Sequence, residues 1–104
     1  MIPLENQQQF EALLNPANKN PEYVVVYFTA SWCGACTKLD HDLIQKSIPE
    51  VVWYKCDIDQ NKYTLGYCSL QKIPSFVVIK NSKFLGKFTS SDTSTVIETL
   101  SASF

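Results

Sequence analysis

The sequence predicts an α/β fold in three layers, a mixed central sheet covered by helices on both faces. Residues 23–30 (YVVVYFTA) are apolar at almost every position, which is typical of a strand buried on both faces. A helical pattern and a second strand pattern follow this segment, and such a unit joins two parallel strands through a right-handed crossover. A hairpin pattern nearer the C-terminus adds antiparallel strands, so the sheet is expected to be mixed.

Two helical patterns flank this buried strand. The first lies between a capping Asn6 and Asn15-Pro16, and its apolar residues Phe10, Leu13 and Leu14 recur at helical spacing. The second pattern predicts one unbroken helix from Cys33 to Lys46. Its inward stripe is expected to consist of Leu39, Leu43 and Ile44.

The remaining strands lie in the second half of the chain. Residues 51–56 (VVWYKC) have strand composition. Residues 76–79 and 84–88 flank Asn81-Ser82, and this arrangement predicts a hairpin.

Two further helices are predicted. A short one covers residues 62–68, although Gly66 lowers its helical propensity. The last begins after a cap at Ser91 or Asp92, and its apolar stripe is Val96, Ile97, Leu100 and Phe104. No repeat, charge block or linker divides the chain, so we expect one domain over residues 1–104.

Composition excludes several classes of function. Nine Lys balance ten Asp and Glu, and there is no Arg, whereas a nucleic-acid binder normally has a basic surplus. The N-terminal segment has no basic region followed by an apolar run, and no stretch is long enough to span a membrane. We therefore expect a cytoplasmic protein in a reducing compartment, where cysteines serve chemistry or packing before they serve as structural cross-links.

The most informative motif is Trp32-Cys33-Gly34-Ala35-Cys36, between the buried strand and the predicted helix. The free amides at a helix N-terminus favour a thiolate there, and the thiolate is the reactive form of cysteine. A spacing of three brings both thiols onto one turn. We expect Cys33 to be the more exposed, attacking thiol and Cys36 to be the shielded, resolving thiol.

The alternative for this cysteine pair is half of a zinc site. Zinc prefers four ligands in two close pairs, but Cys56 and Cys68 lie twelve positions apart and no second CxxC occurs. We therefore predict redox chemistry and no metal.

The motif WCGAC resembles the WCGPC motif of the thioredoxin family, and the similarity extends over almost the whole chain. VVVYFTASWCGAC resembles the strand and active-site turn of that family, KCDID its third strand, and KIPSFVVIKNSKFLGKF its cis-proline loop and final hairpin. The resemblance implies a thioredoxin-like fold and reduction of protein disulfides.

Site roles follow from the same resemblance. It implies that Ile73-Pro74 is cis and faces the dithiol, that Ile73 bonds an extended substrate segment, and that Trp32 is an apolar lid and not a buried core aromatic. It also implies no bound cofactor, electrons from NADPH through a flavin-dependent thioredoxin reductase, and disulfide-containing target proteins as partners of a monomer.

The chain departs from the family pattern at several positions. Tyr27 occupies the place of a buried acid that is thought to accept the proton of the resolving thiol, while Lys55 matches the Lys that accompanies that acid. A phenol is a poor base at neutral pH, so the sequence leaves the acceptor of the Cys36 proton undetermined. Ala35 replaces a Pro between the cysteines, and Ser90 replaces a Gly beside the substrate groove.

For three other residues, the sequence favours roles outside the redox chemistry. Cys56 ends an apolar strand and is expected to be a buried, inert thiol, and Cys68 is expected to be structural or idle, with regulatory oxidation or dimer formation as the alternative. His41 stands where the family helix often has a Pro. It is predicted to be a surface side chain, because a single His without a visible partner is weak support for catalysis.

Two competing functions remain. A thioredoxin-fold binding or chaperone module with a weak dithiol is favoured by Tyr27 and Ser90. An oxidant or isomerase of a secretory compartment is disfavoured because no leader and no His between the cysteines are present.

Overall fold

The computed structural model describes residues 1–104 and contains one five-stranded sheet in the order β1-β3-β2-β4-β5. The strands are β1 (Ile2–Pro3), β2 (Tyr23–Thr29), β3 (Val52–Asp57), β4 (Ser75–Lys80) and β5 (Lys83–Thr89). The central strand β2 runs parallel to β3 and antiparallel to β4, and β4 and β5 form the predicted hairpin. The mixed sheet is therefore confirmed.

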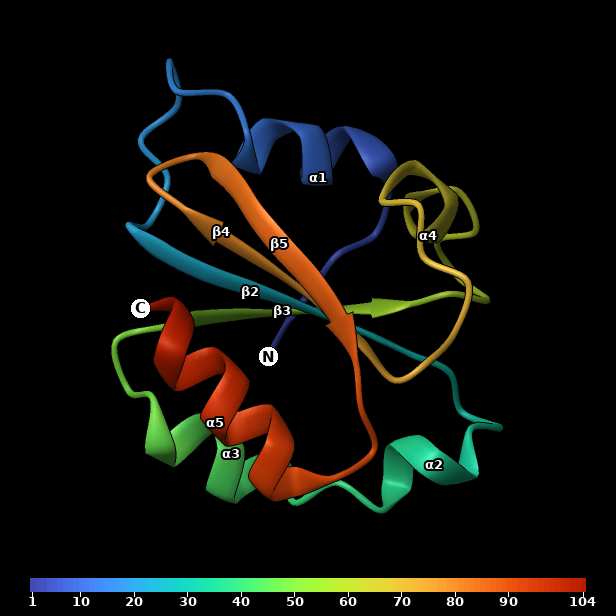
Figure 1. Cartoon of the computed structure of the whole chain (residues 1–104). Helices are drawn as coiled ribbons and strands as arrows, with labels where there is room; N and C mark the ends of the chain where they lie inside the picture. Colours follow the sequence, from blue (N-terminus) through green and yellow to red (C-terminus); the bar gives the residue numbers. More distant parts are fainter.

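Helices cover both faces of this sheet (Figure 1). They are α1 (Gln7–Leu13), α2 (Gly34–Thr37), α3 (His41–Ser47), α4 (Thr64–Tyr67) and α5 (Thr93–Ser103). Helices α1 and α4 lie on one side, α3 and α5 pack together on the other, and α2 lies beyond the end of β2. The three-layer arrangement is confirmed. None of these helices combines the length and the apolar character needed to cross a bilayer.

Strand β2 holds the two halves of the core together. Val24, Val26 and Phe28 belong to the apolar cluster under α1 and α4, whereas Val25 and Tyr27 belong to the cluster under α3 and α5. Fully burying a Val or Phe side chain contributes roughly 1.5–3 kcal/mol, so this strand is a major source of stability. The C-terminal end of β2, which is buried, leads into the turn that carries Cys33 and Cys36.

The single helix predicted from Cys33 to Lys46 is wrong, because the chain breaks at Lys38–Asp40 into α2 and α3. Asp40 leaves the helical conformation (φ −84°, ψ 86°), and its Oδ1 accepts a hydrogen bond from the Leu43 amide at 3.1 Å. Asp is a strong N-cap, so its side chain competes with continuation of the helix. The new helix also changes the phase of the stripe: Leu43 is 49 % exposed, while Leu39 and Ile44 stay buried.

Capping and turn chemistry otherwise follow the sequence. Asn6 caps α1, and Asp92, not Ser91, caps α5 by accepting from the Thr95 amide at 3.0 Å. Asn81 and Ser82 both have positive φ (52° and 62°), as a two-residue hairpin turn with the right-handed strand twist requires. Strand β1 was not predicted, because two residues carry no periodic signal and only pairing with β3 defines the strand.

Candidate functional site

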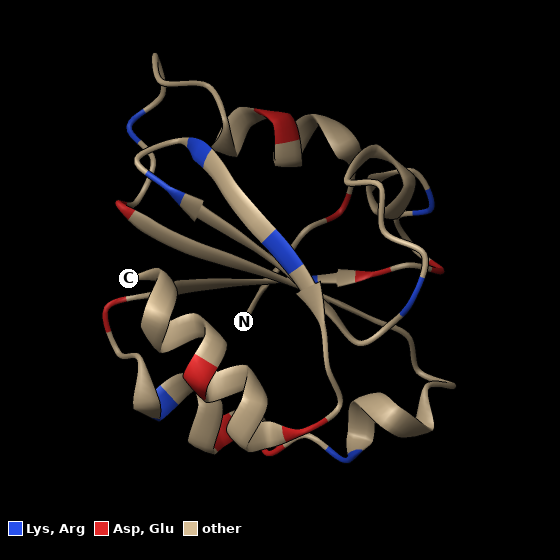
Figure 2. Cartoon of the chain, in the orientation of Figure 1, with Lys and Arg blue, Asp and Glu red and all other residues tan.

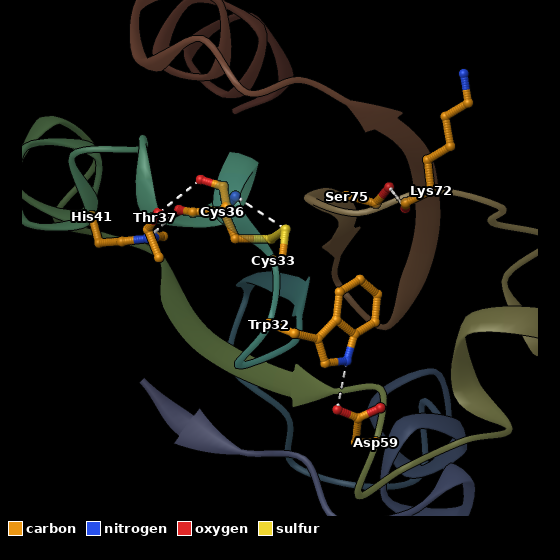
Figure 3. Close-up of a disulfide and its surroundings, with 9 residues drawn as sticks. Trp32, Cys33, Cys36, Thr37, His41, Asp59, Lys72 and Ser75 are labelled. Atoms are coloured by element: carbon orange, nitrogen blue, oxygen red, sulfur yellow. Dashed lines mark hydrogen bonds between the residues drawn. A yellow bond between two sulfur atoms is a disulfide. The ribbon is translucent and has the colours of Figure 1, made fainter.

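Cys33 and Cys36 are joined in a disulfide where β2 gives way to α2 (Figure 3). Cys33 is the N-cap of α2, and its Sγ accepts a hydrogen bond from the Cys36 amide at 3.1 Å. The two Cα atoms lie 5.3 Å apart, within the range of ordinary disulfides. The sulfur of Cys33 thus sits against a free helical amide, the kind of donor that favours a thiolate after reduction.

Both sulfur-bearing residues are shielded from solvent. Cys33 is 6 % exposed and Cys36 is 2 % exposed, so the expected order holds but the difference is small. Gly34 is exposed on the first turn of α2, whereas Ala35 is half-buried and packs against the apolar cluster that contains both cysteines.

Trp32 is not a core aromatic, since it is 65 % exposed beside the dithiol. Its Nε1–H donates to Oδ2 of Asp59 at 2.8 Å, and this bond holds the indole against the loop that follows β3 (Figure 3). No role for Asp59 is predicted from the sequence. The available signal was an acid just past the end of β3, the strand parallel to the one that leads to Trp32.

The Ile73-Pro74 peptide bond is cis, as the resemblance implied. Ile73 is half-buried and packs against the apolar cluster that includes Cys33 and Cys36, and Pro74 is buried. Ser75 holds this loop, because its hydroxyl donates to the Lys72 carbonyl and bonds the Thr89 hydroxyl at 2.6 Å. The cis-proline loop and the dithiol thus share one apolar cluster.

Tyr27 lies in the core below the dithiol, with its ring stacked on Phe76 at 5.2 Å. Burial raises the pKa of the Tyr27 phenol above its ordinary value, although a hydrogen bond with Thr29 opposes this effect. Lys55 is its register neighbour on β3 and is exposed. The phenol therefore stays protonated at neutral pH and has no capacity to accept a proton there.

The expectation of a surface His41 is wrong. The side chain is half-buried, and its Nε2 lies 3.1 Å from the carbonyl oxygen of Cys36 (Figure 3). Its ring centroid is 5.0 Å from that of Tyr27. The Asp40 cap causes this placement, because it starts α3 at His41 and turns the ring back toward α2. No sequence pattern signals a contact that depends on a helix break.

A pocket of about 630 Å³ adjoins this region. Residues from β2, the turn after it, α2, α3 and β3 line it, among them Tyr27, Ser31, Cys36, Thr37, His41 and Lys55. The pocket thus brings the buried cysteine, the imidazole and the phenol to one space.

Cys56 and Cys68 are free thiols in the cluster on the other face of the sheet. Burial raises the pKa of each thiol to about 12; nearby Cys68 and Asp57 add to the shift at Cys56, and Lys87 opposes the shift at Cys68. The prediction that Cys56 is buried is confirmed, and Cys68, which was expected to be structural or idle, is also buried.

Charge and metal-binding groups are sparse around the dithiol. Figure 2 shows acidic and basic residues on helices, strands and loops. None of the residues of α2 is charged, and Lys38 is its C-cap. No three His, Cys, Asp or Glu side chains are grouped so that they would hold a metal ion. Ser90 is half-buried, and its hydroxyl accepts from the Asp92 amide at 3.1 Å.

Comparison with known proteins identifies the relatives of this chain. The thioredoxin family model matches residues 2–102. Thioredoxin of Geodia cydonium is 33 % identical over 87 residues, which cover 82 % of this chain and 80 % of that protein.

Solved structures agree with the sequence match. Fasciola hepatica thioredoxin superimposes with a TM-score of 0.83 at 32 % identity, covering 98 % of both chains. Oxidised mitochondrial thioredoxin 3 of Saccharomyces cerevisiae gives a TM-score of 0.84 at 25 % identity, covering 98 % of this chain and 94 % of the other. With the paired Cys33 and Cys36 at the head of α2, the chain belongs to the thioredoxin family of dithiol–disulfide oxidoreductases.

Proposed function

We propose that the protein reduces disulfides of other proteins, with Cys33 as the attacking thiol and Cys36 as the resolving thiol. In the first step the Cys33 thiolate attacks one sulfur of the target disulfide, and the other target sulfur leaves as a thiolate. Cys36 then loses its proton and attacks Cys33 Sγ, which releases the second target thiolate and forms the Cys33–Cys36 disulfide. The target gains two electrons, and the protein loses two.

The hydrogen bond from the Cys36 amide to Cys33 Sγ carries this assignment. A donor aimed at Cys33 lowers the free energy of its thiolate. Cys36 has less exposed surface and reacts only after the mixed disulfide has formed. We assign supporting roles to Gly34 and Ala35 in shaping the turn, and to Tyr27 and Lys55 below it.

Target binding is assigned to Trp32, Ile73 and Pro74. The indole is exposed and anchored by Asp59, so it offers a flat apolar surface whose orientation is already fixed. The main chain at Ile73 can pair with an extended segment of the target, a form of strand addition.

The reaction needs a source of electrons, because each cycle ends with an oxidised dithiol. We propose that NADPH supplies them through a flavin-dependent thioredoxin reductase, and that the chain itself holds no cofactor. We further propose that it acts as a single domain of residues 1–104, as a monomer, in the cytoplasm. A fluorescent fusion tests the compartment, and mitochondrial fluorescence would contradict this assignment.

Reduction of insulin by dithiothreitol tests the activity. The wild type should accelerate precipitation of the insulin B chain, and Cys33→Ser should abolish the acceleration. Cys36→Ser should instead trap a covalent complex with a disulfide substrate, since the mixed disulfide then has no resolving thiol. A trapped complex through Cys36 in the Cys33→Ser variant would overturn the order of attack.

A binding or chaperone module with a weak dithiol is the second candidate, favoured by Tyr27 in the place of an acid. In that case Cys33→Ser should leave suppression of aggregation of an unfolded client unchanged, and insulin reduction should stay at the background rate even for the wild type.

A further inference from the structure

The resolving step requires an acceptor for the Cys36 proton, and the side chain below Cys36 does not supply one. The pKa of a phenol ordinarily lies near 10 and burial raises that of Tyr27 further, so its phenol is protonated at neutral pH. The thiols on the other face, Cys56 and Cys68, lie outside this region. A side-chain acceptor for this proton would therefore have to lie on another element near Cys36.

His41 is placed for this task by two independent observations. Its Nε2 lies 3.1 Å from the carbonyl oxygen of Cys36, and His41 and Cys36 line the same pocket of about 630 Å³. That volume has room for several water molecules, since each occupies about 30 Å³. A water chain in this pocket can connect the Cys36 thiol with the imidazole.

The contact with the carbonyl also determines which ring nitrogen is free. A carbonyl oxygen only accepts hydrogen bonds, so Nε2 must carry the proton in this contact. The neutral ring then has its lone pair at Nδ1, and gaining a proton there leaves the Nε2–H bond intact. The imidazole can gain and lose a proton without losing its anchor.

We propose that His41, through water in this pocket, accepts the proton of Cys36 during resolution of the mixed disulfide. This inference rests on the proposed function. The Cys36 S–H proton moves through water to Nδ1 of His41, the new thiolate attacks Cys33 Sγ, and the second target sulfur leaves as a thiolate. His41 then returns the proton to solvent or to the departing thiolate, so no further reactant is needed.

Other titratable groups surround this pocket and must be distinguished from His41. Lys55 from β3 and Met1 line the same pocket, and an ammonium group donates hydrogen bonds but accepts none. On α3, Asp40 already accepts from the Leu43 amide, and Asp42 is exposed. On the neighbouring α5, the Asp92 carboxylate accepts from Thr95.

The test separates attack from resolution by stopped-flow mixing of the fully reduced chain with dithiobis(nitrobenzoate). Attack by Cys33 releases one coloured thiolate at a rate that rises with reagent concentration. Resolution by Cys36 releases a second at a rate independent of that concentration. The variants are His41→Gln, which keeps a donor for the Cys36 carbonyl without a titrating group, and His41→Ala.

We expect His41→Gln to resolve about tenfold more slowly than the wild type near pH 7, while its attack phase stays within twofold. The factor lies below the 10²–10⁴ typical of a positioned base because water also accepts the proton. Added imidazole should restore resolution in His41→Ala.

Lys46→Gln is the matched control, because it removes a charge from an exposed position on the same helix. It should leave both phases unchanged. A wild-type resolving rate in His41→Gln would overturn the proposal, as would failure of imidazole to rescue His41→Ala. Failure of the proposed function is a different result: insulin reduction at the background rate by the wild type.

Discussion

The two cysteine pairs of this chain lie on opposite faces of the same sheet and have opposite chemistry. Cys33 and Cys36 belong to the cluster under α3 and α5, and Cys56 and Cys68 belong to the cluster under α1 and α4. All four are buried. Exposure therefore does not separate the reactive pair from the inert one.

Local hydrogen bonding makes the difference. Cys33 Sγ accepts an amide hydrogen at the start of a helix and is bonded to Cys36. The Cys56 thiol donates to the Asn61 carbonyl at 4.0 Å, an acceptor that cannot stabilise a negative sulfur. Burial without a donor raises the pKa of Cys56 and Cys68 to about 12. Donors, and not solvent access, distinguish a working thiol here.

The largest expected effect comes from substituting one cysteine on each face of the sheet. Cys33→Ser should lower insulin reduction to the background rate, a loss of at least about a thousandfold, because no thiolate attacks the substrate. Cys56→Ala should keep activity within about twofold, since the far face takes no part. Insulin turbidity measures both variants, and a comparable loss in Cys56→Ala that retains the native circular dichroism would remove the distinction between the faces.

The second prediction concerns alkylation of the reduced protein with iodoacetamide near pH 8. Cys33 should react first, and Cys56 and Cys68 should stay unlabelled until the chain is unfolded in guanidinium. A rise in pKa from 9.0 to about 12 lowers the thiolate fraction roughly a thousandfold. Mass spectrometry of tryptic peptides reads the order, and early labelling of Cys68 would contradict the assignment.

Stability at high pH provides the third prediction. The folded chain disfavours the thiolates of Cys56 and Cys68, so the unfolded chain releases these protons first as pH rises. The free energy of unfolding should therefore fall from about pH 9 toward pH 12. Urea titrations at several pH values test this, with Cys56→Ala expected to flatten the slope; an equal slope in that variant would exclude Cys56 as a contributor.

The smallest expected effect lies at the rim of the reactive pair. Asp59→Ala removes the acceptor of the Trp32 Nε1–H bond, which is worth about 0.5–1.5 kcal/mol in a typical protein. We expect a mobile indole and a modestly higher KM for insulin, with folding stability changed by less than about 1 kcal/mol. Tryptophan fluorescence anisotropy detects the mobility in a Trp53→Phe background, and unchanged anisotropy would show that other contacts orient Trp32.

The fold class and the dithiol could be read from the chain because both depend on neighbours in sequence. The apolar run of β2, the Asn81-Ser82 turn and the Cys33 to Cys36 spacing are local patterns, and the structure contains each of them. The two-residue β1 was not visible in this way, since it is a strand only through its pairing with β3.

The surroundings of the dithiol depend instead on contacts between distant residues. Trp32 meets Asp59 across 27 positions, and the Asp40 amide that helps to end α2 donates to Thr93 across 53. His41 reaches the Cys36 carbonyl only because the helix breaks between them. Periodicity describes which face of an element is apolar, but it carries no information on which side chain of another element lies opposite. That pairing is a property of packing, and it converts an apparently solitary histidine into a neighbour of the resolving cysteine.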